Sequence, residues 1–382
     1  MRVLLLSSSS GSRGGGEIFL LYLAQALREA GHEPILWCAS HQRMDELAES
    51  FSEIGKVIRD DYPNSYLDRR FRVFSAAFDI RVIRRLARRF SEIDCDVVHI
   101  NKQTLEDGLD LLEAIRHINK PIVGTIHITQ SNCSLGAFAG VWRDTLSRQR
   151  LNRIGDIAWT AVSDARADEL RAVLSGDVHT IYNAVSEAPA AERTRIREEI
   201  IEPRGWPQNT ILVVCVARLV TQKDPSRFIR FAAKLHRRVP NTRFLWIGDG
   251  ELRESFLQQA CNKGLGSVIA CTGWSKEPRR FLAGADLYLH PAAYEGLPLA
   301  ILEAMAAGLP CVLSPEIASE ANVFDESTVI IAKETDDDWL ELVCSENSRR
   351  HYAQTAKRLY LTHFRPEALA DAFVKLYSTT NL

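Results

Sequence analysis

The chain has 382 residues, more than one hydrophobic core usually serves, so two domains of roughly 180 residues each are expected. Its 47 basic and 49 acidic residues nearly balance, which argues against a general nucleic-acid binder, whose surface would be strongly positive. The eight cysteines show no Cys-x2-Cys spacing and several lie within apolar runs, which indicates buried thiols in a reducing compartment rather than disulfides or a metal site.

The start of the chain is apolar only from Val3 to Leu6 and continues with four serines. This run is shorter than the apolar core of a signal peptide, which has about 7–15 residues. No apolar run elsewhere approaches the roughly 20 residues of a membrane-spanning helix. We therefore expect a cytoplasmic protein with at most peripheral contact with a membrane.

Short apolar runs alternate with amphipathic stretches in the N-terminal half, which is typical of a parallel sheet covered by helices. The clearest helical pattern covers residues 17–30. Residues 1–185 are therefore predicted to form a Rossmann-like domain. Its predicted strands are residues 3–6, 34–38, 97–100, 122–126, 157–162 and 178–182.

The pattern breaks at residues 186–209, a polar stretch with three prolines that we interpret as an interdomain linker. Alternation then resumes, so residues 210–365 are predicted to form a second doubly wound α/β domain. The final helical segment, 366–382, is compatible with packing on either domain, including back on the first. The ligand site is expected in the cleft between the domains, at the carboxyl ends of their strands. The second set of predicted strands comprises residues 211–216, 242–247, 267–271, 287–289 and 311–314.

A run of glycines, Gly14 to Gly16, directly follows the first predicted strand and opens the first helix. Glycine lets backbone N–H groups approach a ligand closely, and a helix N-terminus favours anionic oxygens. The run does not match G-x-G-x-x-G, so a nicotinamide-binding fingerprint is absent. Taken alone, it is equally compatible with a tight structural turn.

Two cations follow the strand at 211–216: Arg218, and Lys223 five residues later. A guanidinium fork and a lysine point charge at the carboxyl end of a strand are suited to neutralising a diphosphate. Solvated surface cations are the alternative interpretation.

Two carboxylates, Glu295 and Glu303, are eight positions apart across a predicted junction between a loop and a helix. Together with the free N–H groups of a helix N-terminus, they would form a cradle for sugar hydroxyls and phosphate oxygens. The alternative is that Glu303 forms a structural pair while Glu295 is exposed to solvent.

The segment EGLPLAILEAMAAGLPCV, which contains both carboxylates, resembles the Glu, seven residues, Glu signature of retaining GT-B glycosyltransferases of family 4. Other segments similar to the family appear in the family's order, and together they are far more specific than any one of them. They are the glycine run Gly14 to Gly16, DVVHIN, VGTIH, TAVSDARADEL, IYNAVS, VARLVTQKD, WIGDGELR and TGW…FLAGADLYLHPAAY.

The resemblance implies a GT-B enzyme that moves a sugar from a nucleoside-diphosphate sugar, UDP- or GDP-linked, to a hydroxyl of a glycan or lipid-linked acceptor. The first domain would bind the acceptor and the second the donor. Such enzymes act in the synthesis of cell-surface polysaccharides or glycolipids. Neither a cofactor nor a metal is implied, because the nucleotide sugar is a substrate.

The resemblance also implies roles for individual residues. Glu303 would hold the donor's ribose, and Glu295 would bind the transferred sugar. Arg218 and Lys223 would bind the diphosphate and stabilise the departing nucleotide, a task that suits glycosyl transfer because negative charge gathers on the leaving phosphate. His127 would contact the donor sugar near the reacting centre. The remaining donor contacts would come from Gly15, Gly16, Gly248, Gly250, Gly296, Leu297, Leu299 and Ala300.

The chain departs from the family's common pattern at several places. Asp224 follows Lys223 where the family often has glycine, and Ala217 precedes Arg218 where the family often has glycine. The segment SPEIASE at residues 314–320 replaces a frequent glycine-rich segment. Two alternative functions stay open: a catalytically silent nucleotide-sugar-binding subunit and a GT-B nucleotide-sugar epimerase.

A basic stretch at residues 66–90 contains eight arginines and only two acidic residues. Helical spacing places Arg81, Arg84, Arg85 and Arg88 opposite an apolar stripe. Such a face suits anionic lipid headgroups, at about 1 kcal/mol per cation near the surface. The alternative is a helix packed on the sheet with a solvated basic face. We hypothesise that this face docks on the membrane and presents a lipid-linked acceptor.

Overall fold

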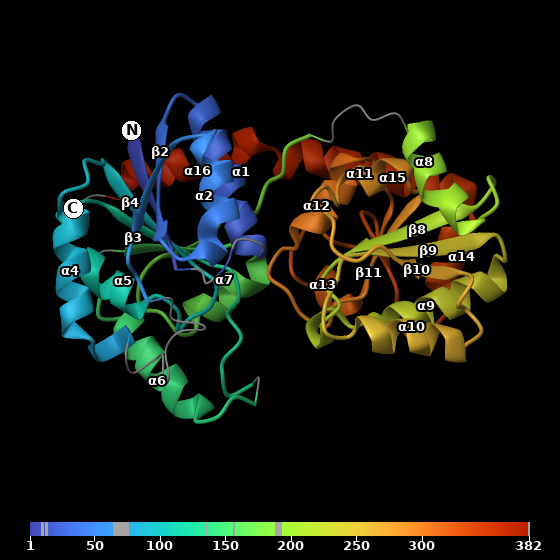
Figure 1. Ribbon diagram of the computed structural model, residues 1–382, viewed down its shortest axis with the longest axis horizontal. Helices are drawn as coiled ribbons and strands as arrows, with labels where there is room; N and C mark the ends of the chain where they lie inside the picture. The colour runs from blue at the N-terminus through green and yellow to red at the C-terminus, as the bar shows by residue number, and fades with distance from the viewer. Residues whose placement is uncertain are drawn as a thin grey trace. The chain divides into compact units, whose positions relative to one another are not determined.

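The computed structural model describes residues 1–8, 11, 14–63, 76–134, 136–155, 157–187 and 193–380. The chain forms two compact units, which we call the first unit, Met1–Ala184 with Pro366–Leu382, and the second unit, Val185–Arg365 (Figure 1). Residues 12–13, which directly precede the glycine run, lie outside the described residues, as do 66–75 of the basic stretch and 188–192 of the predicted linker.

The first unit is built on a seven-stranded sheet with the order β3-β2-β1-β4-β5-β6-β7, in which every pairing is parallel. The six strands predicted in this half are present. Strand β3 was missed because its sequence, KVIRD, lies at the sheet edge and is only partly buried, so it lacks a continuous apolar run. The strands are β1 (Arg2–Ser7), β2 (Glu33–Ala39), β3 (Lys56–Asp60), β4 (Val97–Lys102), β5 (Ile122–Ile126), β6 (Ile157–Ala161) and β7 (Val178–Thr180).

The C-terminal helix packs on the first unit, where it lies beside α1 (Figure 1). It is held by His99, a fully buried residue whose Nδ1 lies 2.7 Å from Tyr377 Oη and whose Nε2 lies 2.7 Å from Thr125 Oγ1. Burial lowers the pKa of His99 to about 3, so it is a neutral structural residue. The helices of this unit are α1 (Gly15–Glu29), α2 (Asp45–Ser52), α4 (Ile80–Ser91), α5 (Leu109–Ile115), α6 (Gly140–Leu151), α7 (Asp164–Arg171) and α16 (Pro366–Thr379).

The second unit is built on a six-stranded parallel sheet with the order β10-β9-β8-β11-β12-β13. The five predicted strands are present, and β13 was missed because it has only two residues. Both sheets reverse their strand order beside the first strand of the unit, so the predicted fold class, two doubly wound Rossmann-like domains, is confirmed. The strands are β8 (Ile211–Val216), β9 (Thr242–Ile247), β10 (Ile269–Cys271), β11 (Leu287–His290), β12 (Cys311–Leu313) and β13 (Ile330–Ile331).

The prediction of a linker at residues 186–209 is wrong over much of its length, because 193–204 form α8 (Arg193–Ile201) and a short 3-10 turn. The charged run that suggested a linker points partly inward: Arg193 and Arg197 pair with Asp286 at 2.7 and 2.9 Å. Three isoleucines of α8 are buried. The other helical elements of the unit are η3 (Thr221–Lys223), α9 (Pro225–Arg238), α10 (Arg253–Asn262), α11 (Arg280–Gly284), α12 (Leu299–Ala306), α13 (Pro315–Ala318), α14 (Asp338–Cys344) and α15 (Glu346–His363).

None of the helices in the described parts of the chain is long and apolar enough to cross a membrane.

Candidate active site

The predicted cations and carboxylates of the second unit follow two neighbouring strands. Arg218 and Lys223 come after β8, and Glu295 comes after β11, which pairs directly with β8. The strand order of the sheet reverses here, since β9 lies on one side of β8 and β11 on the other. In open α/β sheets, ligands bind outside the carboxyl ends of the strands at such a reversal. The predicted donor residues are thus gathered where the fold favours a ligand.

Lys223 and Glu295 form a direct ion pair between Nζ and Oε1. Their side chains are only 15% and 10% exposed, so the pair is largely removed from water. Gln222 supports the same loop, because its Nε2 donates to Tyr294 O at 3.0 Å and lies 3.5 Å from the second oxygen of Glu295. The structure therefore joins two predicted residues and excludes the interpretation of Glu295 as a solvent-exposed carboxylate.

Burial lowers the pKa of the Lys223 ammonium to about 7, and the nearby charge of Arg218 adds to this effect. The contact with the Glu295 carboxylate acts in the opposite direction, as a bound phosphate would, because both favour the charged ammonium. His290 is the third member of the group, with Nε2 3.5 Å from Glu295 Oε1. Burial, reinforced by Lys223, lowers the pKa of His290 well below its ordinary value, so its imidazole is neutral.

Arg218 is exposed, and no carboxylate among the described residues forms an ion pair with it. Its loop is fixed from the other side by Gly248 and Gly250, which pack directly on its backbone. A Cβ on Gly248 would lie 2.0 Å from Ala217 O, and one on Gly250 would lie 2.3 Å from Leu219 O. These glycines therefore hold the Arg218 loop in place, and their predicted contact with the donor stays a prediction.

Glu303 lies within α12 and is buried, with its Oε1 3.7 Å from Arg279 Nε. The helix begins after Pro298 without a side-chain cap among the described residues, so the N–H groups of Leu299 and Ala300 point from an uncapped N-terminus. Such N–H groups bind anions and polar oxygens readily. Gly296 and Leu297 form the buried loop between Glu295 and this helix.

In the first unit, three of the family-like segments meet around Asn101. This residue is the last but one of β4, where it pairs with Ser7 of β1, and its Nδ2 donates to Gly16 O at 3.1 Å. Its Oδ1 lies 2.7 Å from His127 Nε2. Gly16 cannot be replaced without displacing the Gln103 side chain, whose nearest atom would lie 2.1 Å from an added Cβ, whereas the space around Gly15 is open.

The contact with Gly16 fixes the orientation of the Asn101 amide as well as its position. Because the amide nitrogen faces the Gly16 carbonyl, the amide oxygen must face His127, and so we infer that His127 Nε2 carries a proton and donates it. Burial lowers the pKa of His127 to about 4, so the ring is neutral and its Nδ1 is unprotonated. His127 is therefore held in one tautomer with an acceptor nitrogen.

Sequence reasoning missed several residues of these two groups. Asn101 and His290 could have been found, because each is a polar residue at the carboxyl end of a buried strand. Gln222, Gln103 and Arg279 carry no comparable signal, since their partners are distant in sequence.

The predicted basic helix is α4, in which Ile83, Leu86 and Phe90 are buried against the first unit. Arg81, Arg84, Arg85 and Arg88 are all exposed. Arg85 donates to Asp61 O at 2.6 Å. The structure thus shows a packed helix with an exposed basic face. This arrangement is compatible both with membrane docking and with a solvated surface helix.

The chain matches two family models, "Glycosyltransferase Family 4" over residues 13–188 and "Glycosyl transferases group 1" over residues 196–358. The phosphatidyl-myo-inositol mannosyltransferase of Mycolicibacterium smegmatis is 30% identical over 311 residues, which cover 79% of this chain and 72% of that protein.

A second relative is the UDP-Gal:alpha-D-GlcNAc-diphosphoundecaprenol alpha-1,3-galactosyltransferase of Escherichia coli, 32% identical over 130 residues. This match spans only 33% of each protein's length. Among solved structures, Anabaena HepE in complex with UDP and glucose has a TM-score of 0.76 at 18% identity and covers 99% of this chain and 100% of that one. This structural likeness establishes the shared fold.

Proposed function

The chain belongs to family 4 of the glycosyltransferases and has their GT-B fold, and we propose that it is a retaining enzyme that transfers a sugar from a nucleoside-diphosphate sugar. The acceptor would be a hydroxyl of a glycan or a lipid-linked glycan, in the synthesis of a cell-surface polysaccharide or glycolipid. The observation that carries this proposal is the buried group of Lys223, Glu295 and His290 beside Arg218, where β8 and β11 end.

These residues suit the charge changes of glycosyl transfer. Negative charge grows on the leaving diphosphate while the sugar becomes cationic, and fixed cations in a water-poor site stabilise that charge strongly. Lys223 is largely buried, so its ammonium supplies a charge in a fixed position. Arg218 is exposed, so its guanidinium can move to contact the diphosphate. We propose that these cations make a metal unnecessary for departure of the nucleotide.

Glu295 is proposed to bind sugar hydroxyls and not to attack the sugar. Its Oε1 is occupied by the Lys223 ammonium, which stabilises the carboxylate and lowers its nucleophilicity. The acceptor hydroxyl would then attack from the face that the leaving group departs from, which retains the anomeric configuration. The predicted contact of His127 with the donor sugar stays a prediction.

A screen of nucleotide sugars tests this function directly. The E. coli relative is named for UDP-galactose, and the Anabaena structure holds UDP and glucose. UDP-sugars are therefore tested before GDP-sugars. The correct donor should raise the melting temperature by mass action and release its nucleotide slowly, with and without EDTA. NMR should show an α-linked product from an α-linked donor.

The other outcomes of the screen separate the alternatives. Binding without turnover across a broad acceptor panel would indicate a silent nucleotide-sugar-binding subunit. Conversion of the donor sugar into its epimer would indicate an epimerase. A β-linked product would contradict retention, and loss of turnover in EDTA would contradict metal independence.

We also propose that α4 docks on an anionic membrane surface. Arg81, Arg84 and Arg88 are exposed, and no ion pair joins them to another described residue. Changing all three to glutamine should weaken binding to anionic liposomes by on the order of 100-fold at low salt, from about 1 kcal/mol per cation. Co-sedimentation measures this.

The matched control for the membrane prediction removes the same charge elsewhere, at the exposed Arg237, Arg238 and Lys263 of the second unit. If this control loses as much binding as the α4 variant, the interaction depends only on net charge. Binding that is insensitive to salt, or no binding by the wild-type protein, would also contradict docking.

A further inference from the structure

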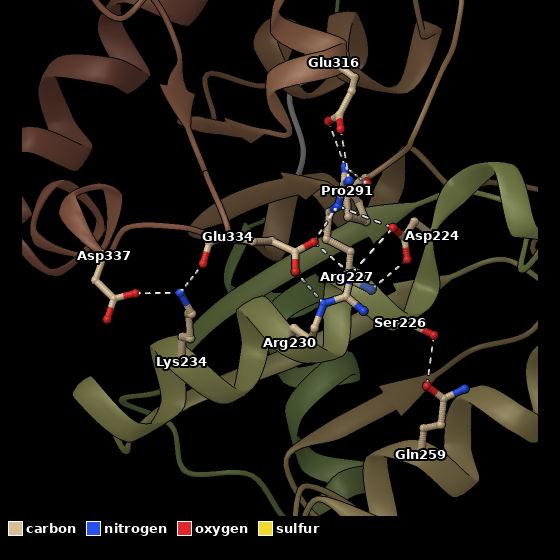
Figure 2. Close-up of polar contacts among 10 residues, drawn as sticks. All are labelled: Asp224, Ser226, Arg227, Arg230, Lys234, Gln259, Pro291, Glu316, Glu334 and Asp337. Atoms are coloured by element: carbon tan, nitrogen blue, oxygen red, sulfur yellow. Dashed lines mark hydrogen bonds and ion pairs between the residues drawn. The ribbon is translucent and has the colours of Figure 1, made fainter.

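Arg227, in the first turn of α9, contacts the loops that follow four adjacent strands of the second sheet (Figure 2). Its guanidinium lies 3.4 Å from Asp224 after β8 and donates to Pro291 O after β11 at 3.3 Å. It also pairs with Glu316 after β12 at 2.8 Å and with Glu334 after β13 at 3.0 Å. One side chain thus links the segments after four of the six strands, at the edge of the sheet on which Lys223 and Glu295 lie.

The first of these contacts explains a departure from the family pattern. Asp224 has φ +43°, in the left-handed region that glycine adopts without strain, and the family often has glycine here. Its carboxylate accepts a hydrogen bond from Arg227 N at 2.9 Å and so caps α9. An aspartate tolerates this backbone better than most residues, and the ion pair with Arg227 adds to the stabilisation.

A second departure from the family pattern supplies another partner of the Arg227 guanidinium. Glu316 belongs to the segment after β12, where the family often has a glycine-rich segment. Its two carboxylate oxygens accept from Arg227 at 2.8 and 3.1 Å. This two-point geometry fixes the relative orientation of both side chains. Arg227 is only 14% exposed, although its partners are more open to solvent. The segment at residues 314–320 therefore anchors Arg227 through Glu316.

The anchored loops are the ones that carry the proposed donor residues. Asp224 directly follows Lys223, and Pro291 directly follows His290. A hydrogen bond from Ala293 N to Gln222 O at 3.0 Å joins the two loops again, next to Glu295. A displacement of either loop would therefore separate Lys223 from Glu295.

We propose that Arg227 is a positioning residue for donor binding, which holds the Lys223 and Glu295 loops in register through Asp224, Pro291 and Glu316. This inference rests on the proposed glycosyl transfer for its kinetic consequences. The geometric part concerns the ligand-free protein and can be measured separately.

Replacing Arg227 with methionine tests the proposal. The variant should lose at least about tenfold in kcat/KM for the donor, mostly through a higher donor KM, because misplaced binding loops are costly. Arg227→Lys should recover part of the loss, because it restores the charge without the fork. Arg230→Met is the matched control, since Arg230 lies one turn later and pairs with Glu334 and Asp224 but reaches neither Pro291 nor Glu316. It should stay within about twofold of wild type.

Hydrogen exchange on the ligand-free proteins supplies a readout that needs no turnover. Amides at residues 292–297 should exchange faster in Arg227→Met than in wild type. Arg227→Lys should show a smaller acceleration, and it supplies the test if the methionine variant does not fold. Unchanged exchange there, or equal acceleration in Arg230→Met, would overturn the proposal. If wild type has no transferase activity but these exchange differences appear, the proposed function fails while the positioning role stands.

The double variant Arg227→Met with Glu316→Gln separates positioning from charge neutralisation. If Arg227 only neutralised Glu316, removing that carboxylate would restore donor KM. We expect no restoration, because the contacts with Asp224 and Pro291 O stay absent. Full restoration would overturn the positioning role.

Discussion

Lys223→Met is expected to lower kcat/KM for the nucleotide-sugar donor by about 100- to 1000-fold, the usual effect of removing one preorganised charge-stabilising group. Methionine keeps the length and apolar volume of the side chain but removes its cation. The loss should fall mainly on kcat, because charge on the diphosphate is greatest in the transition state. Steady-state kinetics with a saturating acceptor measures both parameters.

Two comparisons sharpen this prediction. Lys263→Met makes the same change at an exposed position, and its activity should match wild type. The double variant of Lys223→Met with Glu295→Gln should lose less than the product of the single losses, because the methionine variant leaves the Glu295 carboxylate buried without its partner. A kcat within tenfold of wild type in Lys223→Met would contradict its role in nucleotide departure.

The sequence was sufficient to predict most of the fold because buried parallel strands are continuous apolar runs. β8 and β9 have the predicted bounds at both ends. The edge strands β3 and β13 were missed because one is half exposed and the other has two residues. The α8 region was misjudged because its arginines resemble solvated charges, although their partner Asp286 lies about 90 positions further along the chain.

The sequence predicted which residues gather at the candidate site, but it did not predict how they pair. Motif order identified Lys223 and Glu295, but no pattern showed that they pair directly, since this depends on how the loops after β8 and β11 approach each other. Similarly, His127 was predicted, whereas the chain of contacts from Gly16 through Asn101 that fixes its tautomer was not. Polar contacts between loops follow from backbone geometry, which hydrophobic periodicity does not encode.

The loop after β4, which carries Asn101, depends on a buried carboxylate, Asp107, which is 3% exposed. It accepts hydrogen bonds from Gln103 N at 3.0 Å, from Thr104 N at 2.7 Å and from the Ser8 hydroxyl. The backbone carbonyl of Asp107 also accepts from the ammonium of Lys102, which is fully buried. Burial lowers the pKa of Lys102, and the charges of the neighbouring acids oppose this shift.

Asp107→Ala is therefore expected to destabilise the protein by about 3–5 kcal/mol, because it leaves two backbone N–H groups without an acceptor and removes a negative charge that favours the buried Lys102 ammonium. For a unit of this size, the corresponding fall in melting temperature is about 6–20 °C. Asp107→Asn should lie between alanine and wild type, since it keeps one acceptor oxygen. Asp168→Ala is the control, because Asp168 is 76% exposed and forms a surface ion pair with Arg171, so its melting temperature should stay within about 1 °C of wild type. Equal melting of the Asp107 and Asp168 alanine variants would show that water replaces the lost acceptor, and the loop that positions Asn101 would then not depend on this carboxylate.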